Sequence, residues 1–236
     1  MTRKRLFEHR LVDLPGLETI EHEGRCYYAA PDGFMYPSVT TVIGESLDKS
    51  ALKRWRKRVG EEEAERIGRV ARARGTRFHS VTEAYLMNEE RLPHVASPIE
   101  VEAFRPVRDV LDRCVGAVFG AECSLWSPRL RTAGRADAVV EFDRLPTILD
   151  FKTSLRPKEE RWILNYFLQA TTYALMFEEL TGIAVPQLAV LISVDHDSPQ
   201  LFVKRTESYR DRVEEVFVNS RVEKELTRVD TGFIIE

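Results

Sequence analysis

Apolar side chains recur at two different spacings along the chain, and the change between them separates helical from extended parts. Residues 49–90 are rich in Ala, Glu and Arg and carry apolar residues at roughly helical spacing, which predicts helix with breaks near Gly60 and Gly75. The apolar positions are Ile67, Val70, Ala71, Phe78, Val81 and Tyr85. Residues 98–115 predict a second amphipathic helix, which ends before Gly116.

The period then shortens, and three apolar runs predict three consecutive strands. The runs are rich in Val, Ala, Ile and Phe and span residues 117–126, 132–142 and 146–152. Pro128 and the Asp143-Arg144 pair supply turn signals between them, so we expect the three strands to be antiparallel neighbours.

The segments before and after these runs complete the expected order of elements. Residues 17–42 predict short extended segments with turn signals at Gly24 and Gly33. Pro157 suits a first helical turn and predicts a helix to about Leu180. The pattern then predicts strands at 187–194 and 200–205 and a closing helix at 207–227.

This order predicts an α/β (α+β) fold, a mixed central β-sheet flanked by helices. No internal repeat or low-complexity linker divides residues 1–236, so we expect a single domain. Within it we expect a helical portion at about 45–115 and a core that carries the chemistry at about 117–206.

Charge is distributed unevenly along the chain. The net charge is −3, but residues 53–77 hold ten Lys or Arg and four Glu, a local balance of +6 that leaves −9 for the rest. A basic segment on an acidic body predicts a local polyanion site, with an acidic metal site elsewhere. No apolar run approaches the ~20 residues of a membrane helix. Three scattered cysteines favour a reducing, cytoplasmic setting.

The most informative stretch is GRADAVVEFDRLPTILDFKTS, residues 134–154. Asp150 and Lys152 are two apart on a predicted strand, so their side chains project from the same face. Asp137 lies on the preceding strand, and a hairpin would bring it close to Asp150. Converging carboxylates suit Mg²⁺ or Mn²⁺, which can activate a water for phosphodiester hydrolysis. Lys152 would orient that water or neutralise developing charge. The alternative is a structural ion pair between Asp150 and Lys152.

At these residues the sequence resembles the PD-(D/E)xK nuclease superfamily, in its RecB-like exonuclease branch. That branch has a GxxD strand, a strand ending in DxK, a QxxxY helix, an upstream RGTxxH helix and an acidic residue one strand before GxxD. The matching residues here are Gly134, Asp137, Ile148 to Lys152, Gln169, Tyr173, Arg74, Gly75, Thr76, His79 and Glu122. The segment Pro37 to Thr40 resembles one in mitochondrial and phage single-strand DNA exonucleases. The cysteines of the branch's iron–sulfur subgroup are missing.

The resemblance implies a restriction-endonuclease-like core with an N-terminal helical extension, and it implies roles for flanking residues. His79 would bind the metal or a phosphate, although a solvated histidine is the plainer alternative. Glu122 would hold a metal or a water, or would be an exposed strand residue. Gln169 would act at the edge of the site or bond to local backbone, and Tyr173 would meet a phosphate or pack in the core.

Several residues are candidates for DNA contact. The run from Lys53 to Arg58 encloses Trp55, so basic side chains could follow a phosphate backbone while the ring stacks on a base. A solvated helix face paired with Glu61 to Glu63 is the alternative. The candidates in full are Lys53, Arg54, Trp55, Arg56, Arg58, Arg72, Arg74, Thr153 and Ser154, the last two of which could simply end their strand.

Together these features predict a Mg²⁺- or Mn²⁺-dependent DNA exonuclease that prefers single-stranded DNA with a free end. The sequence has no GxxxxGK[ST] motif, so unwinding would come from a helicase, polymerase or recombination partner. The resemblance suggests the cytoplasm of a bacterium or a phage-infected host. Three alternatives stay open: a restriction-type or structure-specific endonuclease on the same core, a DNA-binding module without catalysis, and a hydrolase of other phosphates.

Overall fold

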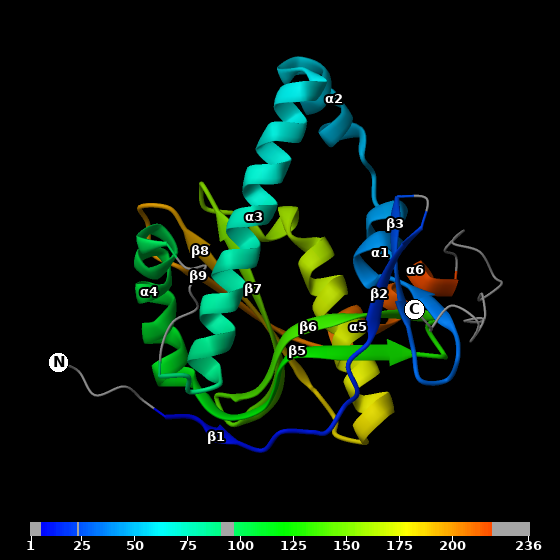
Figure 1. Cartoon of the computed structure of the whole chain (residues 1–236), viewed down its shortest axis with the longest axis vertical. Helices are drawn as coiled ribbons and strands as arrows, with labels where there is room; N and C mark the ends of the chain where they lie inside the picture. The colour runs from blue at the N-terminus through cyan, green and yellow to red at the C-terminus, as the bar shows by residue number, and fades with distance from the viewer. Residues whose placement is uncertain (1–5, 23, 91–96, 219–236) are drawn as a thin grey trace, which may run out of the picture.

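A six-stranded sheet forms the centre of the computed structural model, which describes residues 6–22, 24–90 and 97–218 (Figure 1). Its strand order is β1-β5-β6-β7-β8-β9. The strands are β1 Glu8–His9, β5 Val115–Ser127, β6 Thr132–Phe142, β7 Leu145–Ser154, β8 Gln187–Val194 and β9 Gln200–Arg205. β5, β6 and β7 are antiparallel neighbours, as the sequence predicted, whereas β7 and β8 run parallel. The expected mixed sheet is therefore confirmed.

Helices cover both faces of this sheet, each over its own apolar cluster. α3 (Glu61–Leu86) and α4 (Pro98–Cys114) pack on one face, over residues that include Val140, Leu149 and Phe151. α1 (Val39–Ser46), α5 (Leu164–Thr181) and α6 (Glu207–Val218) pack on the other, over residues that include Val139 and Ile148. Because side chains alternate along a strand, neighbours such as Val139 and Val140 serve opposite faces.

The parallel pairing of β7 and β8 requires a crossover, and α5 supplies it. The predicted start of this helix at Pro157 is wrong. A 3₁₀ turn, Glu160–Trp162, precedes the helix, which begins at Leu164. The Lys158 N–H donates to the Gln200 side chain at 2.6 Å, and the Gln200 amide donates to the Lys158 carbonyl at 3.0 Å. These bonds hold the segment against the start of β9 in place of a first helical turn.

α2 (Ser50–Val59) and the first part of α3 form a helical hairpin that projects beyond the sheet (Figure 1). The predicted break at Gly60 is confirmed, and its φ of +89° explains why glycine stands there. The predicted break at Gly75 is wrong, because α3 continues through it. One glycine inside a helix costs only about 1 kcal/mol relative to alanine, which a packed helix of this length tolerates.

The N-terminal segment differs in part from the extended structure expected for residues 17–42. The expected extended segments are β2 (Glu18–His22), β3 (Arg25–Ala29) and β4 (Met35–Pro37), which pair as a small antiparallel sheet. The chain then turns helical at Val39, where the Ser38 side chain accepts a hydrogen bond from the Thr41 N–H at 3.1 Å. An N-cap of this kind starts a helix despite the β-branched residues that follow. At the other end, the predicted helix 207–227 is seen as far as Val218, and its remainder lies outside the described residues.

Candidate active site

The site forms where β6 and β7 part. Their pairing begins at the turn and ends at Ala138 with Leu149, so Asp137 and Asp150 flank the point of separation. The Phe151 N–H donates to Asp137 Oδ2 at 2.7 Å. A buried backbone donor needs a partner, and here a side chain takes the place of the neighbouring strand. The expected approach of Asp137 to Asp150 is therefore what the structure shows.

Asp150 is almost completely buried, with 1% of its surface exposed. Its Oδ1 accepts a hydrogen bond from Lys152 Nζ at 2.5 Å, whereas its Oδ2 is buried without a hydrogen-bond partner. Burial raises the pKa of Asp150 to about 6, with a further rise from the charge of Asp137 and an opposing effect from Lys152. Burial alone would lower the pKa of Lys152, but the charges of Asp150 and Asp137 outweigh it and raise that pKa.

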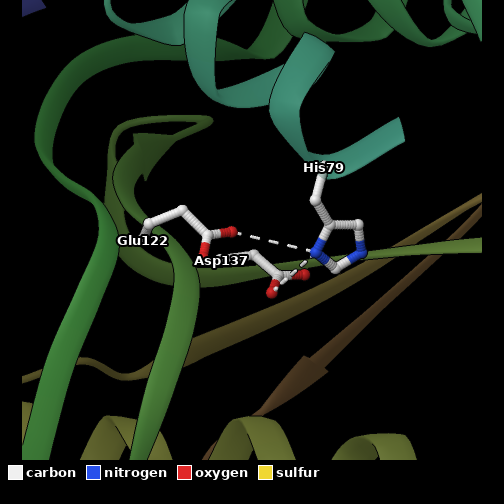
Figure 2. Close-up of side chains that lie close together, drawn as sticks. All are labelled: His79, Glu122 and Asp137. Carbon is white, nitrogen blue, oxygen red and sulfur yellow. Dashed lines mark ion pairs between the residues drawn. The ribbon is translucent and has the colours of Figure 1, made fainter. Parts of the chain in front are cut away.

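His79 reaches the same point from α3 (Figure 2). Its Nδ1 lies 3.4 Å from Asp137 Oδ1 and 3.8 Å from Glu122 Oε1, and its Nε2 lies 2.9 Å from the Phe151 carbonyl oxygen. A solvated surface histidine would have none of these neighbours. The helix therefore brings an imidazole to two carboxylates that come from separate strands.

Glu122 stands in an irregular part of β5. It lies between the pairs Ala121 with Ala138 and Cys123 with Ala136, across from Asp137, and its φ is +48°. For a residue other than glycine, this left-handed backbone conformation costs about 1–2 kcal/mol of free energy. The carboxylate is half-buried, and burial, followed by the charge of Asp137, raises the pKa of Glu122. The strained backbone thus presents a partly buried carboxylate to the site.

These residues fit a divalent metal ion. His79, Glu122 and Asp137 offer ligand atoms that all lie within 4.8 Å of one another. Carboxylate and carbonyl oxygens with one imidazole suit Mg²⁺ or Mn²⁺. Asp150 lies outside this group, but its Oδ2 is buried without a partner, which is a position where a metal ion could complete the coordination. A buried carboxylate oxygen without a partner is costly in the absence of an ion.

Gln169 and Tyr173 lie one turn apart on α5, next to the strand that carries Asp137. Gln169 Nε2 donates to the Tyr173 hydroxyl at 3.4 Å, so the amide bonds to the tyrosine and not to local backbone. Tyr173 is 3% exposed and packs in the core. A side chain at Gly134 would place its Cβ 2.9 Å from the Tyr173 ring, which explains the glycine. Tyr173 therefore packs directly against the β6 backbone three residues before Asp137.

The predicted DNA-contacting residues fall into two groups. Lys53, Arg54 and Arg58 on α2 and Arg72 on α3 are exposed, and Trp55 beside them is half-buried. Others already have partners: Arg56 pairs with Glu61, Arg74 with Asp195, and Ser154 Oγ donates to the Arg156 carbonyl at 2.6 Å. Thr153 is half-buried at the end of β7. The exposed residues can bind a phosphate backbone directly, whereas the paired residues would first have to break their present interactions.

A pocket of about 330 Å³ opens beside the carboxylates, and it contains residues that sequence reasoning missed. It is lined by Thr76, His79, Ser80, Glu83, Glu122 and Arg135. Glu83 is half-buried here, and burial raises its pKa. Arg135 lies in the GRAD segment two residues before Asp137, and this alternate position on the same predicted strand was the available signal.

A mixed sheet that brings two carboxylates, a lysine and an imidazole to the gap between parting strands is an arrangement suited to phosphodiester hydrolysis. The sequence matches the family model of the PD-(D/E)XK nuclease superfamily over residues 37–232. The chain therefore belongs to the PD-(D/E)XK nuclease superfamily, whose members are nucleases that use divalent metal ions.

Two solved structures resemble the chain at low sequence identity. One is a protein from Eubacterium rectale whose assignment as an exonuclease is provisional: it is 13% identical, with 68% of this chain and 71% of that chain covered and a TM-score of 0.34. The other, SSO0001, is 14% identical, with 64% of this chain and 77% of that chain covered and a TM-score of 0.30. No curated protein matches the chain. Within the described residues, no helix has the length and apolar character to cross a membrane.

Proposed function

We propose that this nuclease is a Mg²⁺- or Mn²⁺-dependent DNA exonuclease that prefers single-stranded DNA with a free end. The observation that carries the catalytic part is the buried Asp150 oxygen without a partner, set beside the His79, Glu122 and Asp137 group. We also propose that the chain acts as one domain, with α2 and α3 contacting DNA and the sheet carrying the chemistry.

In this proposal each side chain has a separate task. Asp137, Asp150, His79 and Glu122 would hold the metal ion, which would supply polarisation of the phosphate and a lower pKa for a bound water. Lys152 is kept in place by Asp150 at 2.5 Å and lies over the Tyr166 ring, 5.1 Å from its centroid. Its ammonium group is therefore positioned to orient the attacking water or to neutralise charge on the phosphate. Tyr173 packs against Gly134, and Gln169 is bonded to it, so both position β6.

Two observations support exonuclease action on a single strand. The RGTxxH and QxxxY residues occur in the RecB-like branch, and His79 of the first motif lies in the site. The α2–α3 hairpin projects beyond the sheet and, with Lys53, Arg54 and Arg58 exposed, offers a basic helical surface near the sheet. A strand threaded along such a surface needs a free end, and only unpaired bases can stack fully on Trp55.

The test is to incubate the protein with end-labelled linear and circular DNA, single- and double-stranded, with and without Mn²⁺. We expect linear single strands to be cut much faster than duplex, and closed circular single strands to resist. Rapid cleavage of circular single strands would favour the alternative, an endonuclease on the same core. Binding without cleavage in every arm would favour an inactive DNA-binding module.

A cytoplasmic setting and a partner that supplies single strands are part of the same proposal. Cys26, Cys114 and Cys123 are half-buried and form no disulfide bond, which is consistent with a reducing compartment. The partner would be a helicase, a polymerase or a recombination protein. The test is to measure duplex degradation with and without an added helicase. We expect the helicase to increase the rate, because it supplies the single strands that the nuclease would cut.

A further inference from the structure

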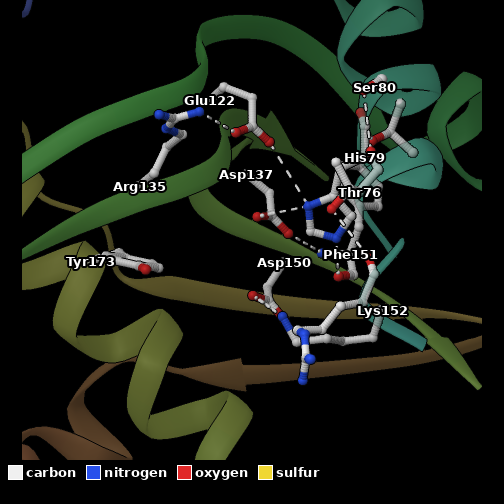
Figure 3. Close-up of polar contacts among 12 residues, drawn as sticks. Thr76, His79, Ser80, Glu122, Arg135, Asp137, Asp150, Phe151, Lys152 and Tyr173 are labelled. Carbon is white, nitrogen blue, oxygen red and sulfur yellow. Dashed lines mark hydrogen bonds and ion pairs between the residues drawn. The ribbon is translucent and has the colours of Figure 1, made fainter. Parts of the chain in front are cut away.

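Arg135 occupies an unusual position for a strand residue. It projects from β6, two residues before Asp137, into the pocket that His79 and Glu122 also line (Figure 3). Its Nη1 lies 3.5 Å from Glu122 Oε2, and 47% of its side chain is exposed. Among the described residues this is its one ion pair, the charge of Glu83 also acts on it across the pocket, and no hydrogen bond engages its guanidinium group.

The charges around the pocket show why an arginine there has consequences. The carboxylates of Glu83, Glu122, Asp137 and Asp150 face the site, and a phosphodiester adds another negative charge. Lys152, which could balance them, is committed to Asp150 at 2.5 Å and is mostly buried. Arg135 is therefore the cation of this described cluster that can meet an incoming strand. Its five N–H donors match the geometry of phosphate oxygens.

We propose that Arg135 is a phosphate-binding residue that exchanges partners: it neutralises Glu122 while the metal site is free, and it binds a phosphate of the DNA strand once a metal has taken Glu122. This inference rests on the proposed function. It adds a residue that contacts substrate and a reason for metal and DNA to bind cooperatively. Arg135 faces Glu122 Oε2, whereas His79 faces Oε1. A metal ion on the His79 side neutralises the carboxylate and so weakens its attraction for the guanidinium group, which is then available to the phosphate.

The partner exchange predicts two effects of opposite sign for Arg135→Ala. Without DNA, loss of the competing cation should tighten Mn²⁺ binding about two- to fivefold, the range expected for a partly exposed ion pair. With Ca²⁺ in place of Mn²⁺, and the strand checked to be intact, affinity for a short oligo-dT strand should fall about tenfold. The salt dependence of that binding should flatten by about 0.7 in slope. A purely structural arginine would not move the two affinities in opposite directions.

Arg129→Ala is the matched control. Arg129 is 48% exposed and pairs with Glu214 at 3.0 Å, away from the pocket. We expect it to leave both affinities unchanged. Arg135→Lys keeps the charge but loses the planar donor fork, so Mn²⁺ affinity should stay close to that of the unsubstituted protein while oligo-dT affinity falls.

Isothermal titration calorimetry with Mn²⁺ and fluorescence anisotropy with labelled oligo-dT measure the two affinities on folded protein, verified by circular dichroism. Unchanged or weaker Mn²⁺ binding in Arg135→Ala would overturn the partner exchange, and unchanged oligo-dT binding would overturn the phosphate contact. If the unsubstituted protein neither binds nor cuts DNA, the proposed function fails. If that protein cuts DNA and Arg135→Ala matches it in both affinities, this inference alone fails.

Discussion

Asp150 shows how much of the site rests on one side chain. Lys152 donates a hydrogen bond to its Oδ1, whereas its Oδ2 is buried without a hydrogen-bond donor. Leaving a buried polar group unpaired costs about 1–3 kcal/mol, and more for a charged one. Natural proteins keep such groups where function needs them. A metal ion that binds the free oxygen would convert this cost into affinity.

The first prediction at this scale concerns Asp137. Asp137→Asn removes a charged ligand but keeps an oxygen that can accept from the Phe151 N–H. We expect the fold to survive, Mn²⁺ affinity to fall at least tenfold, and cleavage to become undetectable. Calorimetry and a single-turnover assay measure these effects. Asp211→Asn on α6, an exposed carboxylate, is the control that should change nothing. Unchanged Mn²⁺ affinity in Asp137→Asn would show that the metal assignment is wrong.

The second prediction concerns the pKa of Asp150, which burial raises to about 6 from 3.8. Between these pH values the folded protein binds a proton that the unfolded chain does not. Stability from this group is therefore present below the lower pKa and is lost as pH rises through about 6. Urea denaturation of the metal-free protein, in a chelator, should show Asp150→Asn gaining stability relative to the unsubstituted protein as pH rises through this window. Parallel pH curves for the two proteins would contradict the raised pKa.

At the scale of elements, the α2–α3 hairpin separates the basic residues into free and paired ones. Lys53, Arg54 and Arg58 are exposed, whereas Arg56 donates to Glu61 at 3.1 Å. Lys53, Arg54 and Arg58 replaced together by Ala should weaken binding of single-stranded DNA and lower its salt slope by about 2, since each lost phosphate contact contributes about 0.7. The cleavage rate at saturating DNA should be preserved. Anisotropy titrations at several salt concentrations measure the slope.

Arg56→Ala is the internal comparison for that prediction. Because its guanidinium group is already paired with Glu61, we expect this single replacement to change the salt slope less than one third of the triple replacement does. Equal effects per residue would show that the Arg56–Glu61 pair opens on DNA. No change in the triple variant would remove α2 from the DNA-binding surface.

At the scale of the whole molecule, the proposed metal ligands join elements that are far apart in the chain. His79 comes from α3, Glu122 from β5, Asp137 from β6 and Asp150 from β7. An ion held by all four ties the helical layer to the sheet, and it binds the folded state alone. Mn²⁺ at a hundred times its dissociation constant should therefore stabilise folding by about 2.7 kcal/mol.

For a chain of this size that stabilisation corresponds to a rise in Tm of about 5 °C or more. Thermal unfolding with Mn²⁺ and with a chelator measures it. Asp137→Asn should show a much smaller rise at the same Mn²⁺ concentration, because the ligand set is incomplete. An equal rise in both proteins would mean that the ion binds elsewhere.

Local periodicity was enough to predict most of the elements. Apolar runs along 132–142 and 146–152, with a turn signal between them, predicted a hairpin. A two-residue spacing put Asp150 and Lys152 on one face, as their 2.5 Å contact shows. Such features depend on residues close in sequence, so they can be predicted without the fold. The same reasoning failed at Gly75 and Pro157, where helix packing and the bond of Lys158 to Gln200 outweigh local preference.

Which residues meet in the site depended on contacts between residues that are far apart in the sequence, and only the folded chain creates these contacts. His79 meets the Phe151 carbonyl across 72 residues of chain, and Arg74 is committed to Asp195 across 121. Neither pairing leaves a periodic signal, since both follow from how α3 packs on the sheet. The sequence by itself determined which strands and which acidic and basic residues were available. The tertiary structure decided which of them converge, which are already paired, and that Arg135 and Glu83 share their pocket, because burial and long-range packing set each side chain's partners.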